Sequence, residues 1–417
     1  MARIGDRSPH ADRGRRTIDA TTMAVLKDRV AFHTSWHSSV REIAQSEWDA
    51  LAAGSPEDWS YYRALEEAPP DDMRLGAASV RDAAGRLIMA VPTFEMHYRL
   101  DTPLQTRVRS VVDRVSRIYP RFARLKVVGL GSPLSDSLGL VASRRLSGDE
   151  REEAFAHLLD CLLAAGKARR ASLVAIKSIT VDDDRMFRRP LDARKLNVVT
   201  SVPVVTLPIQ GRTLDDFYGS LPRKTAAYLK RKHRSANSLA IEYRSSLAGL
   251  EQRVIALYQA TLAQSAVDYG DFDQLSPQLL ASLLDRLGER AKLMLCWHGE
   301  TLVSFQVFLV GSQRIIAYKI GMKYPEAREH NLYFVNWIEM IKFALERGIL
   351  EIEMGATTYS SKLLFGGNLE RRLLRFRFCQ PIANALLRPL ASVFDFEDND
   401  EELQRLIGEG RIERFRP

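Results

Sequence analysis

Short apolar segments and amphipathic helical patterns alternate along most of this 417-residue chain. The segment EEAFAHLLDCLLAAG (152–166) has a helical pattern that ends at a glycine, and SLVAIKSI (172–179) follows it as a buried-strand pattern. Later strands and helices repeat this order. Such alternation is typical of proteins in which helices cover a largely buried sheet. The sequence therefore predicts an α/β (α+β) protein.

The length of the chain predicts two domains, because one ordinary hydrophobic core rarely extends this far. We place a flexible N-terminal tail at 1–26, an N-terminal domain at 27–195, a C-terminal domain at 196–395 and a charged C-terminal tail at 396–417. No segment is apolar over the ~20 residues that a membrane span needs, and a signal-peptide core is missing. We therefore expect a cytoplasmic protein.

The stretch SLPRKTAAYLKRKHRSANS, residues 220–238, carries six lysines and arginines and no carboxylate. Ser220 is a candidate N-cap and Pro222 suits a first helical turn, so we expect a helix here. With a formal net charge of +8, such a helix favours an anionic partner: a phosphate-bearing donor or an anionic membrane surface. A solvated helix face is the alternative. One stripe of the helix would contain Arg223, Ala227, Lys230, Arg231 and Arg234.

The elements of residues 205–367 follow a recognisable order. A strand and the basic helix precede further helices, a hairpin that turns at HGE (298–300), another strand, an apolar helix that ends in ERG, and the strand ILEIEMGA. This order resembles the GNAT acyltransferase superfamily, specifically its FemAB-like branch of tandem domains. In that branch a basic helix opens the second domain, here Lys224 to Arg231, and a strand ends in a glycine followed by a lysine, here Gly355 to Lys362. The likeness spans most of residues 33–378.

The resemblance implies two tandem GNAT-like domains, each with a mixed twisted sheet flanked by helices. It also implies that an acyl thioester donor lies between two central strands, with its pyrophosphate at the start of the next helix. A helix N-terminus suits this task, because its free N–H groups and its dipole attract anions. The strand would be 314–322 and the helix 332–347, although the loop between them lacks the usual spaced glycines. The implied donor-binding residues are Arg223, Lys224, Lys230, Arg231, Tyr318, Asn331 and Leu332.

Four residues near this helix and strand are candidates for catalysis. His330 could act as a general base, since histidine is the usual residue for that task near neutral pH, and Glu353, on the strand LEIEM, is a second candidate base. Tyr359 could protonate a leaving thiolate, and Lys362 could stabilise an oxyanion. The alternatives are a surface histidine, a rim carboxylate and a structural loop. The turn GLGSPLSD (129–136) could form part of the acceptor cleft.

These features predict an N-acyltransferase that uses acyl-CoA or acyl carrier protein as donor substrate, with no permanently bound cofactor and no metal. The segment 371–394 combines arginines with an apolar second half, which suits docking on an anionic membrane surface. A closing strand and a core helix are the alternative for that segment. We expect a long-chain or lipid-like amine as acceptor, such as a sphingoid base in envelope lipid synthesis, and peripheral association with the inner face of the cytoplasmic membrane.

Two other functions stay open. One is a Fem-type transferase that moves an aminoacyl group from tRNA to a peptidoglycan precursor. The chain has no long charged helical hairpin, the arm of Fem enzymes that use tRNA, because the helices expected near 249–288 are short. The other is a non-catalytic envelope-assembly protein on a GNAT scaffold. Nucleic acid other than tRNA is not an expected partner.

Overall fold

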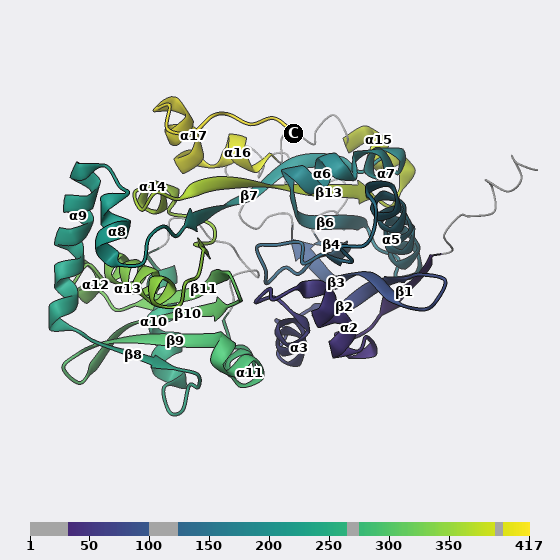
Figure 1. Cartoon of the computed structure of the whole chain (residues 1–417). Helices are drawn as coiled ribbons and strands as arrows, with labels where there is room; N and C mark the ends of the chain where they lie inside the picture. Colours follow the sequence, from purple (N-terminus) through teal and green to yellow (C-terminus); the bar gives the residue numbers. More distant parts are fainter. Residues whose placement is uncertain (1–31, 100–123, 265–274, 388–394) are drawn as a thin grey trace, which may run out of the picture.

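The computed structural model describes residues 32–99, 124–264, 275–387 and 395–417, so the tail expected at 1–26 lies outside the described residues. Within these ranges, one sheet of thirteen strands runs through the molecule (Figure 1). The strands are β1 (His33–His37), β2 (Met73–Arg81), β3 (Leu87–Arg99), β4 (Arg124–Leu130), β5 (Val141–Ala142), β6 (Leu173–Thr180), β7 (Asn197–Pro208), β8 (Ala240–Arg244), β9 (Ala291–His298), β10 (Thr301–Val310), β11 (Arg314–Met322), β12 (Glu351–Glu353) and β13 (Asn368–Phe378).

Strands β7 and β13 join the two halves of this sheet. The order is β1-β2-β3-β4-β6-β13-β7-β12-β11-β10-β9-β8, and β5 pairs with β3. Strand β13 pairs with β6 of the N-terminal half on one side and with β7 of the C-terminal half on the other. Two strand pairs are parallel, β4 with β6 and β11 with β12, so each half contains a mixed sheet. The predicted fold class is confirmed.

Helices cover both faces of the sheet. In the C-terminal half, α10 and α11 pack on one face, and α8, α9 and α13 pack on the other. None of the helices in the described ranges has both the length and the apolar character needed to cross a membrane. The helices are α2 (Gln45–Ala52), α3 (Trp59–Glu67), α5 (Gly148–Ala168), α6 (Val181–Met186), α7 (Arg188–Ala193), α8 (Leu214–Gly219), α9 (Arg223–His233), α10 (Glu251–Leu262), α11 (Pro277–Leu287), α12 (Glu326–Glu329), α13 (Leu332–Glu346), α14 (Tyr359–Leu363), α15 (Pro381–Leu387), α16 (Phe396–Asn399) and α17 (Glu401–Gly408).

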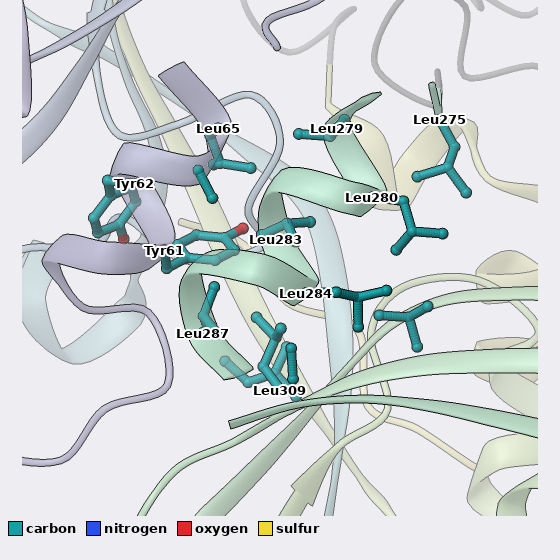
Figure 2. Packing of buried hydrophobic residues seen from close by; sticks show 14 of the residues in the cluster. Tyr61, Tyr62, Leu65, Leu275, Leu279, Leu280, Leu283, Leu284, Leu287 and Leu309 are labelled. Atoms are coloured by element: carbon teal, nitrogen blue, oxygen red, sulfur yellow. The ribbon is translucent and has the colours of Figure 1, made fainter. Parts of the chain in front are cut away.

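An apolar interface between α3 and α11 holds the two halves together (Figure 2). Leucines recur at helical spacing along α11, and all of them are buried against Tyr61 and Leu65 of α3 and the sheet. At the edge of this interface, Arg286 of α11 forms an ion pair with Glu67 of α3. Because the halves share one core, a site between them can have a fixed geometry. The leucines are Leu279, Leu280, Leu283, Leu284 and Leu287.

The basic helix begins later than its sequence predicted. Ser220 ends α8, where its hydroxyl donates to the Phe217 carbonyl at 2.8 Å, and α9 starts after Pro222 with no side-chain cap. Ser220 is therefore not the N-cap of the basic helix. Ser220 is instead the C-cap of the short helix α8, which precedes α9. One serine followed by one proline does not reveal such a helix.

The segment 396–417 is a folded part of the C-terminal half. Leu403 and Leu406 of α17 are fully buried in the core beside α13 and α14. Asp395, just before α16, accepts a hydrogen bond from the Thr200 N–H of β7 at 3.1 Å. Its charged residues belong to the exposed face of an amphipathic helix whose apolar face is buried, so the segment that the sequence indicated as a charged tail packs on the domain.

The arginines of β13 face partners within the protein, which supports the closing-strand alternative for this segment. Arg375 is 2% exposed and lies between acidic residues of α6 and α7. Residues 388–394 lie outside the described residues. The ion pairs of β13 join Arg371 to Glu397, Arg372 to Glu370 and Arg375 to Asp184.

Candidate active site

The two parallel strands of the C-terminal half separate after three paired residues. Arg314–Ile316 of β11 pair with Glu351–Glu353 of β12. Beyond this point β11 continues to Met322, whereas the chain after Glu353 follows β7, and the Met354 N–H donates to the Val205 carbonyl at 2.7 Å. A gap therefore opens between neighbouring strands. Within the described residues, no strand pairs with this side of β11 beyond Ile316.

A bulge in β11 directs Tyr318 toward the N-terminal half. The register between β10 and β11 shifts after Val307: Val307 pairs with Lys319 and Phe308 with Ala317, so the register skips Tyr318. Its ring packs edge-on against Tyr61 of α3, with the ring centroids 6.4 Å apart. Bulges commonly re-aim a side chain beside a functional site. Tyr318, a predicted donor-binding residue, thus lies at the junction of the halves.

A loop of the N-terminal half enters the gap between β11 and β12. A Cβ atom at Gly355 would lie 3.4 Å from Oδ2 of Asp136 and 3.8 Å from the Ala317 carbonyl oxygen. The φ angle of Gly355 is +71°, which a residue with a side chain rarely adopts. The backbone conformation therefore favours glycine here, and the Asp136 carboxylate lies next to this residue at the point where the two strands diverge. Asp136 is half-buried and belongs to the turn GLGSPLSD, which we expected near the acceptor cleft.

Buried polar contacts hold this loop in place. The Ser135 and Ser137 hydroxyls both donate to the Glu57 carboxylate, the second at 2.5 Å. Nζ of Lys177, on β6, donates to the Ser135 carbonyl at 2.5 Å and to the Ser178 hydroxyl at 3.1 Å. Burial raises the pKa of Glu57 and lowers that of Lys177, since it disfavours the charged form of each. The position of Asp136 thus depends on contacts between distant segments.

Glu353 lies at the end of β12 in a cluster of charges. Its Oε2 is 3.4 Å from an Arg314 nitrogen and 3.8 Å from an Arg372 nitrogen, and the residue is 1% exposed. Burial, followed by the nearby negative charges of Glu57 and Asp136, raises the pKa of Glu353 to about 8, although both arginines oppose this. At neutral pH this side chain is therefore mostly a neutral carboxylic acid.

Lys362 lies beneath a strained turn that follows β12. Thr357 and Thr358 have φ angles of +64° and +47°, which are unusual for β-branched residues. Nζ of Lys362 donates to the carbonyls of Gly355 at 3.0 Å and Ala356 at 2.5 Å, and so holds the turn from inside. Burial lowers the pKa of Lys362 to about 7. Strained backbone that the surroundings enforce is a common feature of functional sites.

The N-terminus of α13 lies at the other end of the gap. No side chain caps it, because Oδ1 of Asn331 instead accepts a hydrogen bond from Nζ of Lys232 at 2.6 Å. Helix α9 therefore lies beside the first turn of α13, and Lys232 also lies over the Phe334 ring at 5.5 Å. An uncapped helix start next to a lysine is suited to binding an anion. The sequence-predicted residues Asn331 and Leu332 both belong to this turn.

The other predicted donor-binding cations lie on the outer face of α9. Arg223, Lys224, Lys230 and Arg231 are all exposed. Lys230 forms an ion pair with Asp215 at 2.9 Å, so this residue of the stripe already has an acidic partner within the protein. Lys232, which reaches Asn331, was not among the predicted site residues.

His330 and Glu353 are not brought together. The His330 ring packs on the His298 ring with centroids 4.4 Å apart, beside the hairpin of β9 and β10. Glu353 pairs alongside Ile316, and β11 continues for six more residues to Met322. At about 3.3 Å per residue, these two ends of β11 are roughly 20 Å apart. His330 therefore lies near the start of α13, away from Glu353.

Tyr359 begins α14 and is part of the core. It is 1% exposed, and its hydroxyl donates to the Pro203 carbonyl at 3.4 Å. Its backbone N–H donates to Glu402 of α17 at 3.1 Å. Of the four predicted catalytic residues, only Glu353 and Lys362 lie where the strands separate.

Sequence reasoning missed four charged residues of this site: Glu57, Asp136, Lys177 and Arg372. Asp136 ends the turn GLGSPLSD, and the glycines and proline of this turn were the one local signal that could have indicated it. Glu57 follows Ser55-Pro56 in a short connection, and Lys177 lies within an otherwise apolar strand, so neither has a local pattern that marks it. They meet only because the strand order places β6, β13, β7 and β12 side by side.

Comparison with known proteins agrees with this geometry. Residues 223–362 match the family model described as Acetyltransferase (GNAT) domain. The crystal structure of FemX is similar with a TM-score of 0.56 and 13% identity, covering 83% of this chain and 98% of FemX. A tandem GNAT protein from the clavulanic acid biosynthesis pathway has a TM-score of 0.48 and 12% identity, with coverage of 84% and 99%. No curated protein matches the sequence.

The matched domain contains the gap between β11 and β12, the uncapped start of α13, Glu353 and Lys362. The FemX likeness extends over both halves of the sheet. Residues 223–362 therefore match a GNAT acetyltransferase domain, and the chain shares the fold of FemX across both halves of the sheet.

Proposed function

We propose that the protein is an N-acyltransferase that moves an acyl group from a thioester donor, acyl-CoA or acyl carrier protein, to an amine acceptor. One observation carries the proposal: the gap between β11 and β12 has an anion-attracting helix start at one end and the Asp136, Glu353 and Lys362 side chains at the other. A donor with a phosphate group and a long arm to its thioester suits that separation. The GNAT match to residues 223–362 supports this choice of reaction.

In the proposed reaction, the acceptor enters as an ammonium ion and must lose a proton before it attacks. Asp136 is the most exposed carboxylate of the cluster, so we assign it to bind the ammonium and take its proton. The amine nitrogen then bonds to the thioester carbonyl carbon and releases its second proton to solvent, the C–S bond breaks, and the sulfur leaves as a thiolate that takes up a proton. Products are an amide and a free thiol.

Lys362 and Glu353 have supporting roles in this proposal. Below pH 7 or so Lys362 carries a positive charge that stabilises the oxyanion, although two backbone carbonyls already bind it. Glu353 holds a proton at neutral pH, which makes it the proton donor for the thiolate rather than the base. Tyr359, the earlier candidate for that step, donates instead to a buried carbonyl.

For the acceptor, we propose a long-chain or lipid-like amine such as a sphingoid base, used in envelope lipid synthesis at the inner face of the cytoplasmic membrane. The support is the exposed cationic face of α9, which an anionic membrane surface would attract. The arginines of β13 give no further support, since their partners are within the protein.

A second candidate function has an observation in its favour. The fold is similar to that of FemX, and the same cationic face could contact the phosphates of an aminoacyl-tRNA. In that case the donor ester replaces the thioester, and a peptidoglycan precursor supplies the amine.

The test is a product assay with three donors. Purified protein is incubated with a sphingoid base, or with a peptidoglycan precursor, and with acyl-CoA, acyl carrier protein or charged tRNA, and products are identified by mass spectrometry. We expect an amide from a thioester donor. CoA should also raise the melting temperature, because it binds only the native state. Product from charged tRNA alone would favour the second function, and no product from any donor would favour a non-catalytic scaffold.

A further inference from the structure

The turn that carries Lys362 is held from outside by the C-terminal helix α17. The N–H groups of Tyr359 and Ser360, the first residues of α14, donate to Oε2 and Oε1 of Glu402 at 3.1 and 2.8 Å. Thr358 precedes α14 and provides no side-chain cap. Glu402 thus caps a helix that lies about forty residues earlier in the chain, and a carboxylate suits this place because a helix N-terminus attracts negative charge.

The position of Glu402 is itself fixed by the packing of α17. Asp400 caps this helix by accepting a hydrogen bond from the Leu403 N–H at 2.8 Å. Leu403 and Leu406 are fully buried in the core. Arg405 donates a hydrogen bond to the Ser360 hydroxyl at 3.1 Å. The helix is therefore anchored on the same side as α14, so Glu402 cannot move away without disturbing this packing.

The segment between Gly355 and Lys362 needs such support. Three of its residues, Gly355, Thr357 and Thr358, have positive φ angles, and two of these are β-branched. Strain of this kind persists only where the surrounding contacts enforce it. From inside, Lys362 binds the Gly355 and Ala356 carbonyls, and from outside Glu402 binds the first two N–H groups of α14.

We propose that Glu402 is a positioning residue, which holds the strained Gly355–Lys362 turn in the conformation that presents Lys362 to the gap between β11 and β12. The proposal rests on the N-acyltransferase function for its catalytic consequence. The C-terminal helix α17 thereby influences the reaction without touching either substrate.

Glu402 also acts on Lys362 through its charge. The charged groups that face Lys362 are Asp136 from the N-terminal loop, Glu402 from α17 and Glu353 from β12, and each raises the pKa of Lys362 against the larger effect of burial. The Trp337 ring of α13 lies 5.8 Å from its Nζ. Removal of the Glu402 charge should therefore lower the pKa of Lys362, which a purely structural role would not do.

The test compares Glu402→Gln and Glu402→Ala with Glu401→Gln, a matched change at the exposed neighbour on the same helix. Hydrogen exchange over residues 355–364 is measured by mass spectrometry. Trace acetylation of Lys362 against pH, relative to exposed Lys224, gives its titration midpoint. In Glu402→Ala we expect amide exchange to be about tenfold faster, since two charge-assisted hydrogen bonds are lost. In Glu402→Gln the Lys362 midpoint should move to lower pH, and the alkaline limb of turnover, where Lys362 loses its charge, should move with it.

Three results would overturn the proposal. The first is unchanged exchange and an unchanged Lys362 midpoint in both Glu402 variants, and the second is an equal midpoint shift in Glu401→Gln. The third applies if Glu402→Ala does not fold: the Glu402→Gln variant then decides alone, and an unchanged Lys362 titration midpoint in that variant overturns the proposal. Exchange and acetylation need no substrate, so they remain decisive even if no donor supports turnover and the proposed function fails.

Discussion

The two halves of the molecule each contain a strand–helix–strand unit, but the N-termini of the two helices differ in capping and in charge. In the N-terminal half, α5 connects the parallel strands β4 and β6, and in the C-terminal half α13 connects β11 and β12. Helix α5 begins with a capping box of Ser147 and Glu150, and Asp149 adds a second acidic residue to its first turn. Helix α13 has no side-chain cap and no acidic residue in its first turn, and Lys232 lies beside it.

This difference assigns separate tasks to the halves. The start of α5 is satisfied by its own side chains and carries negative charge, so it repels an anion, whereas the start of α13 attracts one. The N-terminal half instead contributes the loop with Asp136, which enters the gap of the C-terminal half. Under the proposed function, one copy of this repeated unit binds the donor, and a loop of the other half forms part of the reactive centre.

The largest effect should come from the N-terminal contribution to the gap. Replacement of Asp136 by Asn removes the group to which we assign the acceptor proton, so turnover should fall by about 10²–10⁴-fold. Asp149→Asn, at the start of α5, should leave turnover unchanged. Steady-state rates with a thioester donor and an amine, together with melting temperatures, check both. Equal rates for the two variants would show that the N-terminal half takes no part in the chemistry.

A smaller effect is expected on donor affinity. Lys232→Ala removes the cation at the start of α13, and loss of one charge-assisted hydrogen bond to a phosphate should weaken CoA binding by about tenfold or more. Glu150→Gln at the start of α5 is the matched change in the other half and should not alter the affinity. Titration calorimetry with CoA measures both constants. The comparison breaks down if the α5 variant gains a CoA site or the α13 variant binds normally.

The pH dependence of stability should distinguish a buried carboxyl from a surface one. Between pH 4.5 and about 8, folded Glu353 holds a proton that the unfolded chain releases, so the free energy of unfolding falls as pH rises through this window. Glu353→Gln should therefore remove part of that fall and raise the melting temperature at pH 8 by a few degrees.

Glu47 in the N-terminal half provides the contrast. A hydrogen bond from Arg81 lowers the pKa of Glu47, so its contribution to stability is present above its unfolded pKa and is lost as pH falls. Glu47→Gln should act in the opposite direction to Glu353→Gln. Thermal unfolding between pH 4 and 9 measures both, and a steeper fall with rising pH in Glu353→Gln would contradict the assignment.

The smallest effect on folding is expected at the outer face of α9. Combined replacement of Lys230, Arg231 and Arg234 by Ala should change the free energy of unfolding by about 1 kcal/mol or less, because these side chains are exposed. Binding to vesicles that contain anionic lipid should weaken, and its dependence on salt should become flatter. Sedimentation with vesicles measures this. Unchanged vesicle binding with weaker tRNA binding would instead favour the second candidate function.

Much of the fold could be predicted because its signals are local. The HGE turn between β9 and β10, the apolar pattern of α13 and the glycine after it all appear where the sequence placed them. The site was only half predictable. The spacing of Gly355 and Lys362 indicates part of the site. His330, which precedes α13, was a candidate on equal terms, but it lies roughly 20 Å along β11 from Glu353 at about 3.3 Å per residue.

The sequence by itself determined the order of strands and helices, the basic character of α9 and the glycine that ends α13, because each depends on neighbours within a turn or two of chain. Only the tertiary structure decided which charges meet. Glu57, Asp136 and Glu353 come from three distant segments, and the sheet order that places β6, β13, β7 and β12 together makes them one cluster. Protonation depends on burial and on neighbouring charge, and both depend on contacts far apart in the chain. For that reason the state of Glu353 and Lys362 could not be predicted from their own surroundings in the sequence.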